Sequence, residues 1–331
     1  MGHAAPFGLR RLEVGNEEYD MSGYSAQYKL ITDAVWRHDP RVHIVASGRW
    51  IWPSGVAGFG SSSALGRIAD RIEGSPCLMG LRCDEWDEHF YRTPNQLAAL
   101  ADFYDSYNRS WPKVFVGEYA ANLPVEGVVH KSLRAAVAEA MFMIGFERNA
   151  DVVTASAFAP LLNNVHGTQW HFNLINFNAT HLYTLPSYQA QSMFRAKLGD
   201  HTLLSQRDGG HPHWSATASV SSTLQAKHAH RFTTIVVKLA NYHRAQLLVD
   251  VRLMGWGGLH GVDASVLTAD DPDAENTLDQ PERVVPTRLD LSWQSDANAV
   301  AVAMPPWSIV VVECKVRSSR RRFQRARARK R

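Results

Sequence analysis

The spacing of apolar residues changes near position 188, and this change divides the chain into two parts with different folds. Before that point, short apolar runs alternate with stretches whose apolar residues recur every three or four positions, the pattern of strands and helices in turn. Five strands are expected before residue 160, and this alternation is typical of a parallel sheet covered by helices. After it, β-branched and alternating runs are separated only by turns, which predicts an antiparallel sandwich or barrel.

These patterns place the individual elements. Strands of the first part are expected at Arg11–Gly15, Val42–Ser47, Lys113–Gly117 and Val152–Ala157 and within Leu78–Tyr91. Helices are expected at Tyr24–Arg37, Leu65–Ile72, Asn95–Tyr107, Ser132–Arg148 and Pro186–Ala196, and a loop rich in Gly and Ser at Trp52–Ser63. Strands of the second part are expected at Thr202–Leu204, Ala216–Ser222, Phe232–Ala240, Ala245–Arg252, Val284–Asp290 and Trp307–Val312.

Basic residues gather at the C-terminal end. Ten of the 35 Lys and Arg residues lie between Lys315 and Arg331, and without them the net charge of +3 becomes −7. A nucleic-acid-binding domain is expected to be basic, so we expect no nucleic-acid partner for the folded part. The charged block itself predicts a solvated, disordered tail over residues 317–331, with binding to nucleic acid or an anionic surface as the alternative.

The sequence gives weak signals about the compartment. No run of about 18 apolar residues is present, so no membrane-spanning helix is expected. Met1–Leu9 has no apolar core of the kind a signal peptide needs. Two Asn-x-Ser/Thr sequons, at Asn108 and Asn178, would be glycosylated only in a eukaryotic secretory pathway.

The three cysteines do not form a recognisable metal site. Cys77, Cys83 and Cys314 lack the spacing of zinc ligands, and the histidines are scattered. Cys77 and Cys83 could pair in a secreted protein, but free buried thiols are the stronger expectation. We expect no metal ion and no cofactor.

Two glutamates directly follow strands of the first part. Glu17 comes after Gly15 and Asn16 at the end of the first strand, and Glu118 ends the strand that contains Lys113–Gly117. In a (β/α)8 barrel, the carboxyl ends of the strands form the active site. Cleavage of a glycosidic bond needs one carboxylic acid for the leaving oxygen and a second carboxylate that attacks the anomeric carbon or activates water. The alternative is that both are solvated strand-end side chains.

A third strand end favours the catalytic interpretation. The segment from Glu85 to Arg92 contains acidic residues, an imidazole and a phenol. His89 and Tyr91 are two positions apart, so on a strand they point to the same face. A tyrosine hydroxyl there can hydrogen-bond a catalytic carboxylate and keep it ionised. A lone histidine is more often structural, but in this company we place His89 in the site.

An ordered series of motifs now identifies a resemblance. The chain resembles the α-L-arabinofuranosidases of glycoside hydrolase family 51 in the type found in plants, fungi and some bacteria. Its catalytic-part motifs are Pro6-Phe-Gly-Leu-Arg10, Glu13-Val-Gly-Asn-Glu17, Asp87-Glu-His-Phe-Tyr91, Ser110 to Ala120, Phe158-Ala-Pro-Leu161, Trp170 with Ile175-Asn-Phe177, and Tyr183 to Tyr188. The second part contributes Lys238-Leu-Ala-Asn241, Glu275 to Pro281, and Val285-Pro286.

The resemblance implies roles for named residues. Glu17 would be the acid/base at the fourth barrel strand, and Glu118 the nucleophile at the seventh. Asn16 would bind the sugar 2-hydroxyl, Tyr91 would bind the nucleophile, and His89 would line the pocket. Trp170 and Asn173, where the match is loose, would touch the sugar.

The resemblance also implies the reaction and its setting. A retaining, extracellular exo-glycosidase would remove terminal non-reducing α-L-arabinofuranosyl groups from polysaccharides such as arabinoxylan and arabinan. Its two carboxyl groups should lie about 5–5.5 Å apart rather than 6.5–9.5 Å. No membrane partner is implied, and the oligomeric state is open.

The chain also departs from the family pattern. If Glu17 ends the fourth strand, strands one to three are absent, and the Arg-rich tail has no counterpart. The expected organisation is a partial (β/α)8 TIM barrel (strands four to eight) over residues 1–188, a C-terminal antiparallel β-sandwich over 189–316 and the tail over 317–331. Open strand edges favour aggregation, so we expect the chain expressed alone to be poorly soluble and nearly inactive.

Two alternatives compete with the leading interpretation. One is a truncated, catalytically inactive remnant or a sugar-binding fragment, which the missing strands favour and the presence of both glutamates opposes. The other is a clan-related glycosidase acting on β-glucan or xylan, which the Gly-Asn-Glu17 and Gly-Glu118-Tyr-Ala motifs oppose.

Overall fold

A computed structural model gives the fold of the chain. It describes residues 2, 7–18, 23–48, 76–77, 79–124, 131–208, 213–221, 232–295 and 297–317. The expected helix at Leu65–Ile72, the expected loop at Trp52–Ser63, and the tail beyond residue 317 lie outside these residues. None of the described helices is long and apolar enough to cross a membrane.

The first part contains the expected parallel sheet. Its strands are β1 (Arg11–Val14), β2 (His43–Ala46), β3 (Glu85–Tyr91), β4 (Lys113–Ala120) and β5 (Val153–Phe158). They pair in sequence order, and every pair is parallel. The prediction of five strands before residue 160 is confirmed, and all carboxyl ends therefore meet at one edge of the sheet.

The sheet is strongly curved. The Arg11 guanidinium on β1 donates to Glu85 on β3 at 2.8 Å and to Thr154 on β5 at 3.2 Å. Thr154 also donates to Glu85. The Arg11 side chain thus connects the first and fifth strands of the sheet. It can span them only because the sheet curves around its inner face.

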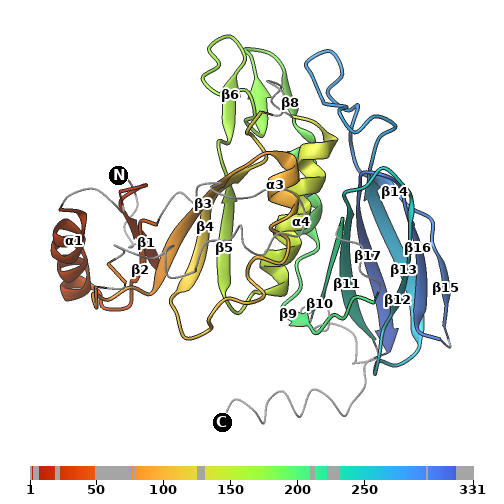
Figure 1. Cartoon of the computed structure of the whole chain (residues 1–331), viewed down its shortest axis with the longest axis horizontal. Coiled ribbons are helices and arrows are strands. Elements are labelled where there is room, and N and C mark those ends of the chain that lie inside the picture. The colour runs from red at the N-terminus through yellow and green to blue at the C-terminus, as the bar shows by residue number, and fades with distance from the viewer. Residues whose placement is uncertain are drawn as a thin grey trace.

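The helices are α1 (Tyr24–His38), α3 (Pro94–Ala98), α4 (Leu133–Arg148) and α5 (Pro186–Ala196). Three of the four match the expected ranges within one residue. Most residues of α4 are buried on every side of the helix, from Leu133 to Phe146. Figure 1 shows why: α4 lies between the parallel sheet and the second part of the chain, so it has no solvent face.

The expected helix at Asn95–Tyr107 is wrong beyond Ala98. Residues 99–106 form successive turns closed by hydrogen bonds between residues three apart, such as Phe103 to Leu100. Close packing against α4 explains the difference. The Ala101 carbonyl accepts from Arg148 at 2.7 Å and lies over Gly145, so it is held by tertiary contacts rather than by a helical ladder.

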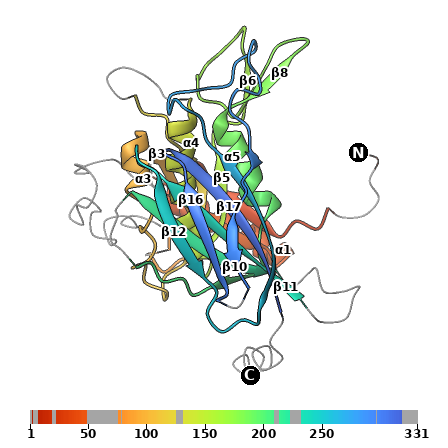
Figure 2. The same ribbon diagram turned by 90° about the vertical axis from the view of Figure 1, so that its right-hand side faces the viewer.

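The second part is a β-sandwich. A six-stranded sheet has the order β14-β13-β17-β11-β10-β9 and faces a three-stranded sheet with the order β12-β16-β15 (Figure 2). The strands are β9 (His201–Leu203), β10 (Trp214–Ser221), β11 (Phe232–Asn241), β12 (Leu247–Arg252), β13 (Leu259–Leu267), β14 (Thr287–Arg288), β15 (Ser292–Gln294), β16 (Ala299–Met304) and β17 (Ser308–Arg317).

Three strands of the sandwich escaped the sequence pattern. β13 contains Gly261 and a register shift, β16 is rich in Ala, and β15 is short and exposed. Gly and Ala are weak strand formers, and a three-residue strand is too short to show a pattern, so long-range pairing decides the conformation of these segments. The expected strand Val284–Asp290 is reduced to β14.

A small third sheet follows β5. It comprises β6 (Leu162–Asn164), β7 (Ile175–Phe177) and β8 (Leu182–Thr184) and was not expected from the sequence. Figure 1 shows it extending from one end of the molecule above α4 and α5. The loop between β6 and β7 carries the predicted residues Trp170 and Asn173.

One apolar core joins the two main parts. Phe142 and Ile144 of α4 belong to the same buried cluster as Phe194 of α5 and Val236 and Val311 of the sandwich. The buried Lys238 on β11 adds a polar link, because it pairs with Glu147 and donates to the Phe194 carbonyl. The sandwich therefore covers the outer face of α4.

The expectation of free thiols at Cys77 and Cys83 is wrong. The two cysteines form a disulfide just before β3, while Cys314 is a buried free thiol. Spacing alone left both states open, and the hydrogen bond from the Leu81 amide to the Pro76 carbonyl, at 3.2 Å, folds the chain back near the two cysteines. Both side chains pack against the buried clusters of the first part.

We predict that Gly145→Ala destabilises the fold. A Cβ at this position would lie 2.4 Å from the Ala101 carbonyl oxygen, and backbone on both sides would have to shift. Such overpacking costs about 1–3 kcal/mol, which a urea or thermal unfolding curve measures. The matched control is Gly167→Ala, where the new Cβ meets nothing within 4 Å, and the unfolding midpoint should not change. Equal midpoints for both variants would contradict the prediction.

Candidate active site

The turn after β1 presents Glu17. Gly15 has φ 93° and Glu17 itself has φ 57°, a left-handed conformation that is unfavourable for a residue with a Cβ. Strain of this kind persists where the surrounding structure enforces it, often at functional sites. The Glu17 side chain is 39% exposed, and Asn16 beside it is exposed.

Glu118 lies on β4, the strand next to β3 in the sheet. Its backbone pairs with His89 on β3, after a register shift between Asp87 and His89. The Tyr91 hydroxyl donates to Glu118 Oε2 at 2.5 Å. The sequence prediction of a tyrosine on this carboxylate is thus matched by the geometry.

His89 lies between the two glutamates. Its Nδ1 is 2.7 Å from Glu17 Oε1 and 3.4 Å from Glu118 Oε2, and its Nε2 pairs with Asp87 Oδ2. One carboxylate oxygen of Glu17, one of Glu118 and the imidazole nitrogen all lie within 4.8 Å of one another. The structure therefore brings together two carboxylates from separate strands around one buried imidazole.

These contacts change the ionisation of the site. Burial acts to lower the pKa of His89, but hydrogen bonds and charges from Asp87 and Glu17 and the charge of Glu118 overcome it and raise the pKa to about 9. Burial and the contact with Glu118 raise the pKa of Tyr91, so its hydroxyl stays protonated. Burial and the neighbouring Asp87 raise the pKa of Glu13 to about 8. At neutral pH, His89 is cationic and Glu13 is neutral.

Trp170 and Asn173 lie in the loop between β6 and β7. The indole of Trp170 is about half exposed (49%). Asn173 is buried, and its amide donates to the Leu162 carbonyl at 2.7 Å, which gives it a role in holding the loop. Nothing in the described contacts connects either residue to the glutamates.

Sequence reasoning missed three residues at the site. Asp87 and Glu13 lie behind His89, and the Phe172 ring contacts the Tyr91 ring at a centroid distance of 6.4 Å. Asp87 could have been found, because residues 87, 89 and 91 share one face of a strand. No sequence pattern could have identified Phe172 as a site residue, because its position depends on the path of an irregular loop.

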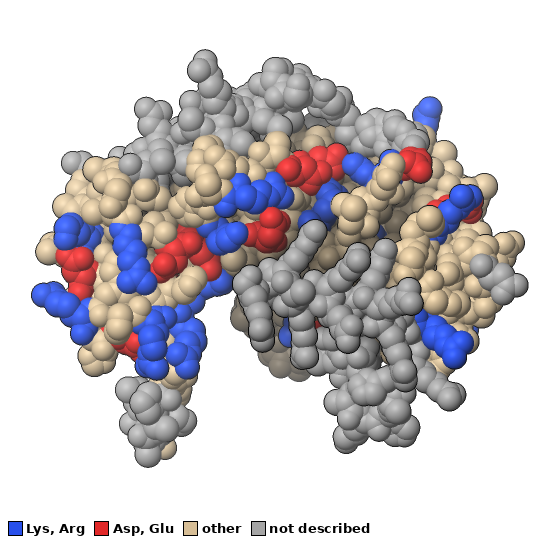
Figure 3. All heavy atoms as spheres, turned by 90° about the horizontal axis from the view of Figure 1, so that it is seen from below, with Lys and Arg blue, Asp and Glu red and all other residues tan. Residues whose placement is uncertain are grey.

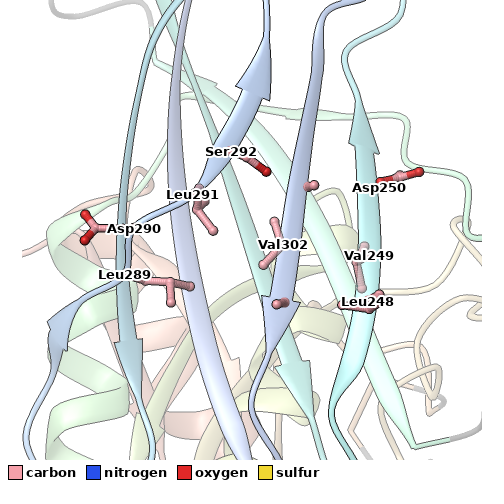
Figure 4. Close-up of a pocket in the computed structure, with 10 residues that line it drawn as sticks. Leu248, Val249, Asp250, Leu289, Asp290, Leu291, Ser292 and Val302 are labelled. Carbon is pink, nitrogen blue, oxygen red and sulfur yellow. The ribbon is translucent and has the colours of Figure 1, made fainter.

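A pocket lies on the sandwich, away from these residues. Its volume is about 340 Å³, and Figure 4 shows Val249 and Val302 with Leu289 and Leu291 along its walls. Its acidic groups, Asp250 and Asp290, are both exposed. The pocket contains no buried acid or imidazole and is not suited to acid–base chemistry.

The described surface mixes charges of both signs. On the face shown in Figure 3, Lys and Arg side chains alternate with Asp and Glu, and they form no continuous basic area. Charges of opposite sign also pair among the described residues, as Arg148 does with Asp102 and Arg109 with Asp151. The described residues on this face form no extended basic surface of the kind that a phosphate backbone contacts.

Comparison with known proteins now adds to the geometry. A family model described as "Alpha-L-arabinofuranosidase C-terminal domain" matches residues 117–308, and one described as "Alpha-L-arabinofuranosidase 1 domain" matches residues 1–109. The chain belongs to the α-L-arabinofuranosidases of glycoside hydrolase family 51. The resemblance inferred from the motifs is confirmed.

Two curated relatives of this family span nearly the whole chain. Alpha-L-arabinofuranosidase 1 of Arabidopsis thaliana is 30% identical over 317 residues, which are 93% of this chain and 41% of the relative. Alpha-L-arabinofuranosidase A of Aspergillus niger is 30% identical over 321 residues, which are 94% of this chain and 44% of the relative. The chain thus spans about two fifths of the length of these relatives.

Solved structures of family 51 share the fold. The arabinose-bound MgGH51 α-L-arabinofuranosidase superposes with a TM-score of 0.77 and 25% identity over 95% of this chain and 46% of its own length. The arabinofuranosidase of Thermotoga maritima, also with arabinose, gives a TM-score of 0.66 at 17% identity over 95% of this chain and 68% of its own.

Two carboxylates and an imidazole within 4.8 Å raise the question of a bound cation. The cationic His89 repels a cation, and its two ring nitrogens both face carboxylates instead. We therefore keep the expectation that no metal ion takes part and assign none to this site.

The expectation of a metal-free glycosidase predicts that EDTA treatment leaves hydrolysis unchanged, because the proton transfer and covalent attack of such an enzyme need only carboxylates. The measurement is hydrolysis of an aryl arabinofuranoside before and after chelation and dialysis. Added Zn²⁺ or Mn²⁺ should not stimulate the rate. Loss of activity on chelation that a divalent ion restores would contradict this.

We predict that Glu13→Gln changes how stability depends on pH. The folded protein holds the Glu13 proton more tightly than the unfolded chain, so its contribution is fully present below the ordinary value of 4.5 and is lost as the pH rises through about 8. In Glu13→Gln this loss should disappear, so the variant gains stability relative to wild type between pH 5 and pH 8. Urea unfolding across this range measures the difference. Glu282→Gln, in an exposed loop, is the control; a wild-type pH dependence in Glu13→Gln would contradict the prediction.

Proposed function

We propose that this chain supplies both catalytic carboxylates of a retaining α-L-arabinofuranosidase, with Glu17 as acid/base and Glu118 as nucleophile. The observation that carries the proposal is the approach of their carboxylate oxygens to within 4.8 Å. Retaining enzymes need this closeness, because one carboxylate attacks the carbon whose leaving oxygen the other protonates. An inverting enzyme would need a longer separation to admit water.

The reaction proceeds in two displacements. Glu118 attacks the anomeric carbon, the bond to the leaving oxygen breaks, and Glu17 transfers its proton to that oxygen. Glu17 then takes a proton from water, which attacks the anomeric carbon and releases Glu118. The hydrogen bond from Tyr91 and the nearby imidazole of His89 hold the Glu118 carboxylate in place for the first step. Asn16, exposed beside Glu17, would bind the sugar 2-hydroxyl.

The substrate assignment rests on the family. Two relatives are named α-L-arabinofuranosidases, and one of Streptomyces chartreusis, 35% identical over 62% of this chain, is named an extracellular exo-α-L-arabinofuranosidase. We assign terminal arabinofuranosyl groups of arabinoxylan or arabinan as the substrate and an extracellular location. Trp170, half exposed in its loop, would contact the sugar, and Asn173 would act through the shape of that loop. The likeness to a family 30 xylanase, at 12% identity, is one of fold alone.

The architecture is assigned in the same way. Residues 1–188 would form strands four to eight of a (β/α)8 barrel, and residues 189–316 the sandwich. The contact of Arg11 on β1 with Thr154 on β5 supports this, because it gives the sheet the curvature of a barrel wall. Within the described residues, β1 and β5 each have one neighbour in the sheet.

The decisive test is hydrolysis of 4-nitrophenyl α-L-arabinofuranoside at high enzyme concentration. We expect slow turnover with retained configuration, followed by NMR of the first-formed sugar. Glu118→Ala should lower the rate at least about 10³-fold, because no covalent intermediate forms. Glu313→Gln on β17 is the control and should keep the wild-type rate. An inverted product, or equal rates for wild type and Glu118→Ala, would overturn the proposal.

Glu17→Ala tests the second role. Loss of the general acid should slow substrates with poor leaving groups by about 10²–10⁴-fold and affect activated aryl substrates less. Azide should restore turnover of the activated substrates and give the arabinosyl azide with retained configuration. Equal loss for both substrate classes, with no effect of azide, would show that Glu17 is not the acid/base.

A further inference from the structure

Asp87 connects three strands behind the two glutamates. It is 1% exposed on β3, and its Oδ1 accepts from the Gly117 amide of β4 at 2.7 Å. Its Oδ2 pairs with His89 Nε2, and the Glu13 carboxyl of β1 shares a hydrogen bond with it. A single buried carboxylate therefore contacts the residue before Glu118, the imidazole beside Glu17 and the strand that leads to Glu17.

Two glycines make room for Asp87. A Cβ on Gly48 would lie 1.2 Å from the Asp87 carbonyl oxygen, and one on Gly117 would lie 2.3 Å from its Oδ1. Any side chain at either position would displace Asp87. Neither glycine has a positive φ, so the backbone conformation does not require glycine there. Glycine is required because a side chain would collide with Asp87.

The contact with Gly117 coincides with an irregularity in the sheet. The pairing of β3 with β4 shifts register between Asp87 and His89, so that His89 lies opposite Glu118. Such bulges re-aim side chains and are frequent next to active sites. Asp87 holds the bulge through the Gly117 amide, and the direction of the Glu118 side chain depends on it.

Both ring nitrogens of His89 face carboxylates. Nε2 faces Asp87 of β3, and Nδ1 faces Glu17 after β1 and Glu118 of β4. Each nitrogen finds an acceptor only if it carries a proton, so the contacts select the imidazolium. The other ionisable groups of the cluster are Glu13, which is neutral at pH 7, and the Tyr91 hydroxyl, which is neutral throughout.

We propose that Asp87 is a positioning residue that keeps His89 doubly protonated between Glu17 and Glu118 and fixes the Gly117 amide, so that the placement of both carboxylates depends on it. The inference rests on the proposed function. The imidazolium lies beside the nucleophile before attack. It also favours the state in which Glu17 has given up its proton to the leaving oxygen.

Glu13 completes the arrangement from behind. As a neutral acid, it donates its proton to Asp87, so the pair bears one negative charge, which His89 balances. Glu13→Gln preserves a neutral donor, whereas Asp87→Asn removes the negative charge at nearly unchanged size. The two variants separate the charge of Asp87 from the packing around it.

Histidine NMR on the full chain measures directly whether each ring nitrogen of His89 carries a proton. ¹⁵N-labelled wild type should show His89 with both nitrogens protonated at pH 7 and a transition near pH 9, with the signal assigned by its loss in His89→Gln. In Asp87→Asn the transition should fall by more than about one pH unit. In Glu13→Gln the imidazolium should persist at pH 7. Glu85→Gln is the matched control, because Glu85 is equally buried on the same strand but pairs with Arg11, and it should leave the His89 signal unchanged.

Kinetics supply the second readout. With the aryl arabinofuranoside, Asp87→Asn should lower kcat about 10–100-fold, the range for residues that orient reacting groups, with a smaller change in KM. In wild type the alkaline limb of the pH profile should follow the His89 transition near pH 9, and in Asp87→Asn it should move to lower pH with that transition. Glu85→Gln should keep the wild-type limb.

The inference is overturned if wild-type His89 is neutral at pH 7, or if its transition is the same in Asp87→Asn. Should Asp87→Asn fail to fold, the wild-type and Glu13→Gln spectra still decide, since a neutral His89 in either overturns it. If turnover depends on Glu118 but His89 is neutral, this inference is wrong and the proposed function stands. If His89 is an imidazolium but turnover does not depend on Glu118, the proposed function is wrong. The role of Asp87 in catalysis is then wrong as well.

Discussion

The contact of one buried imidazole with three carboxylates is the interaction on which the site depends. Without a proton on each nitrogen of His89, Asp87, Glu17 and Glu118 would bring like charges together in a partly buried space. Repulsion of that kind is costly at low dielectric. The imidazolium turns the same closeness into attraction. The short separation that a retaining glycosidase needs is therefore compatible with a folded site.

The parallel sheet makes this convergence possible. Glu17 follows β1, His89 lies on β3 and Glu118 on β4, and all three strands run in the same direction. Their carboxyl ends meet at one edge because the sheet is parallel, and the curvature seen in the contact between Arg11 and Thr154 turns the side chains toward each other. A flat sheet of the same order would hold Glu17 farther from Glu118.

Much of this could be predicted from sequence because it depends on local patterns. Short stretches of sequence determine the helical periodicity of Tyr24–His38 and Leu133–Arg148. They also determine that Glu17 and Glu118 lie at the ends of strands. The motifs supplied the pairing of Tyr91 with Glu118. Most of what could not be predicted depends on distant contacts: the turns after Ala98 held by Arg148 and the bulge that Asp87 holds. The disulfide is local, but its spacing alone did not decide between paired and free thiols. Phe172 belongs to the same class, because only the folded loop brings it to Tyr91.

The sandwich is part of the frame of the site rather than a detachable module. α4 is buried on nearly every side, and its apolar residues share one core with Val236 and Val311 of the sandwich. The same helix places Glu139 against the Ala121 amide, directly after β4, at 3.0 Å. Without the sandwich, the outer face of α4 would be exposed to water, at a cost of about 25 cal/mol per Å² of apolar surface. The strand that carries Glu118 is thus held from behind by a helix whose own burial requires the second part of the chain.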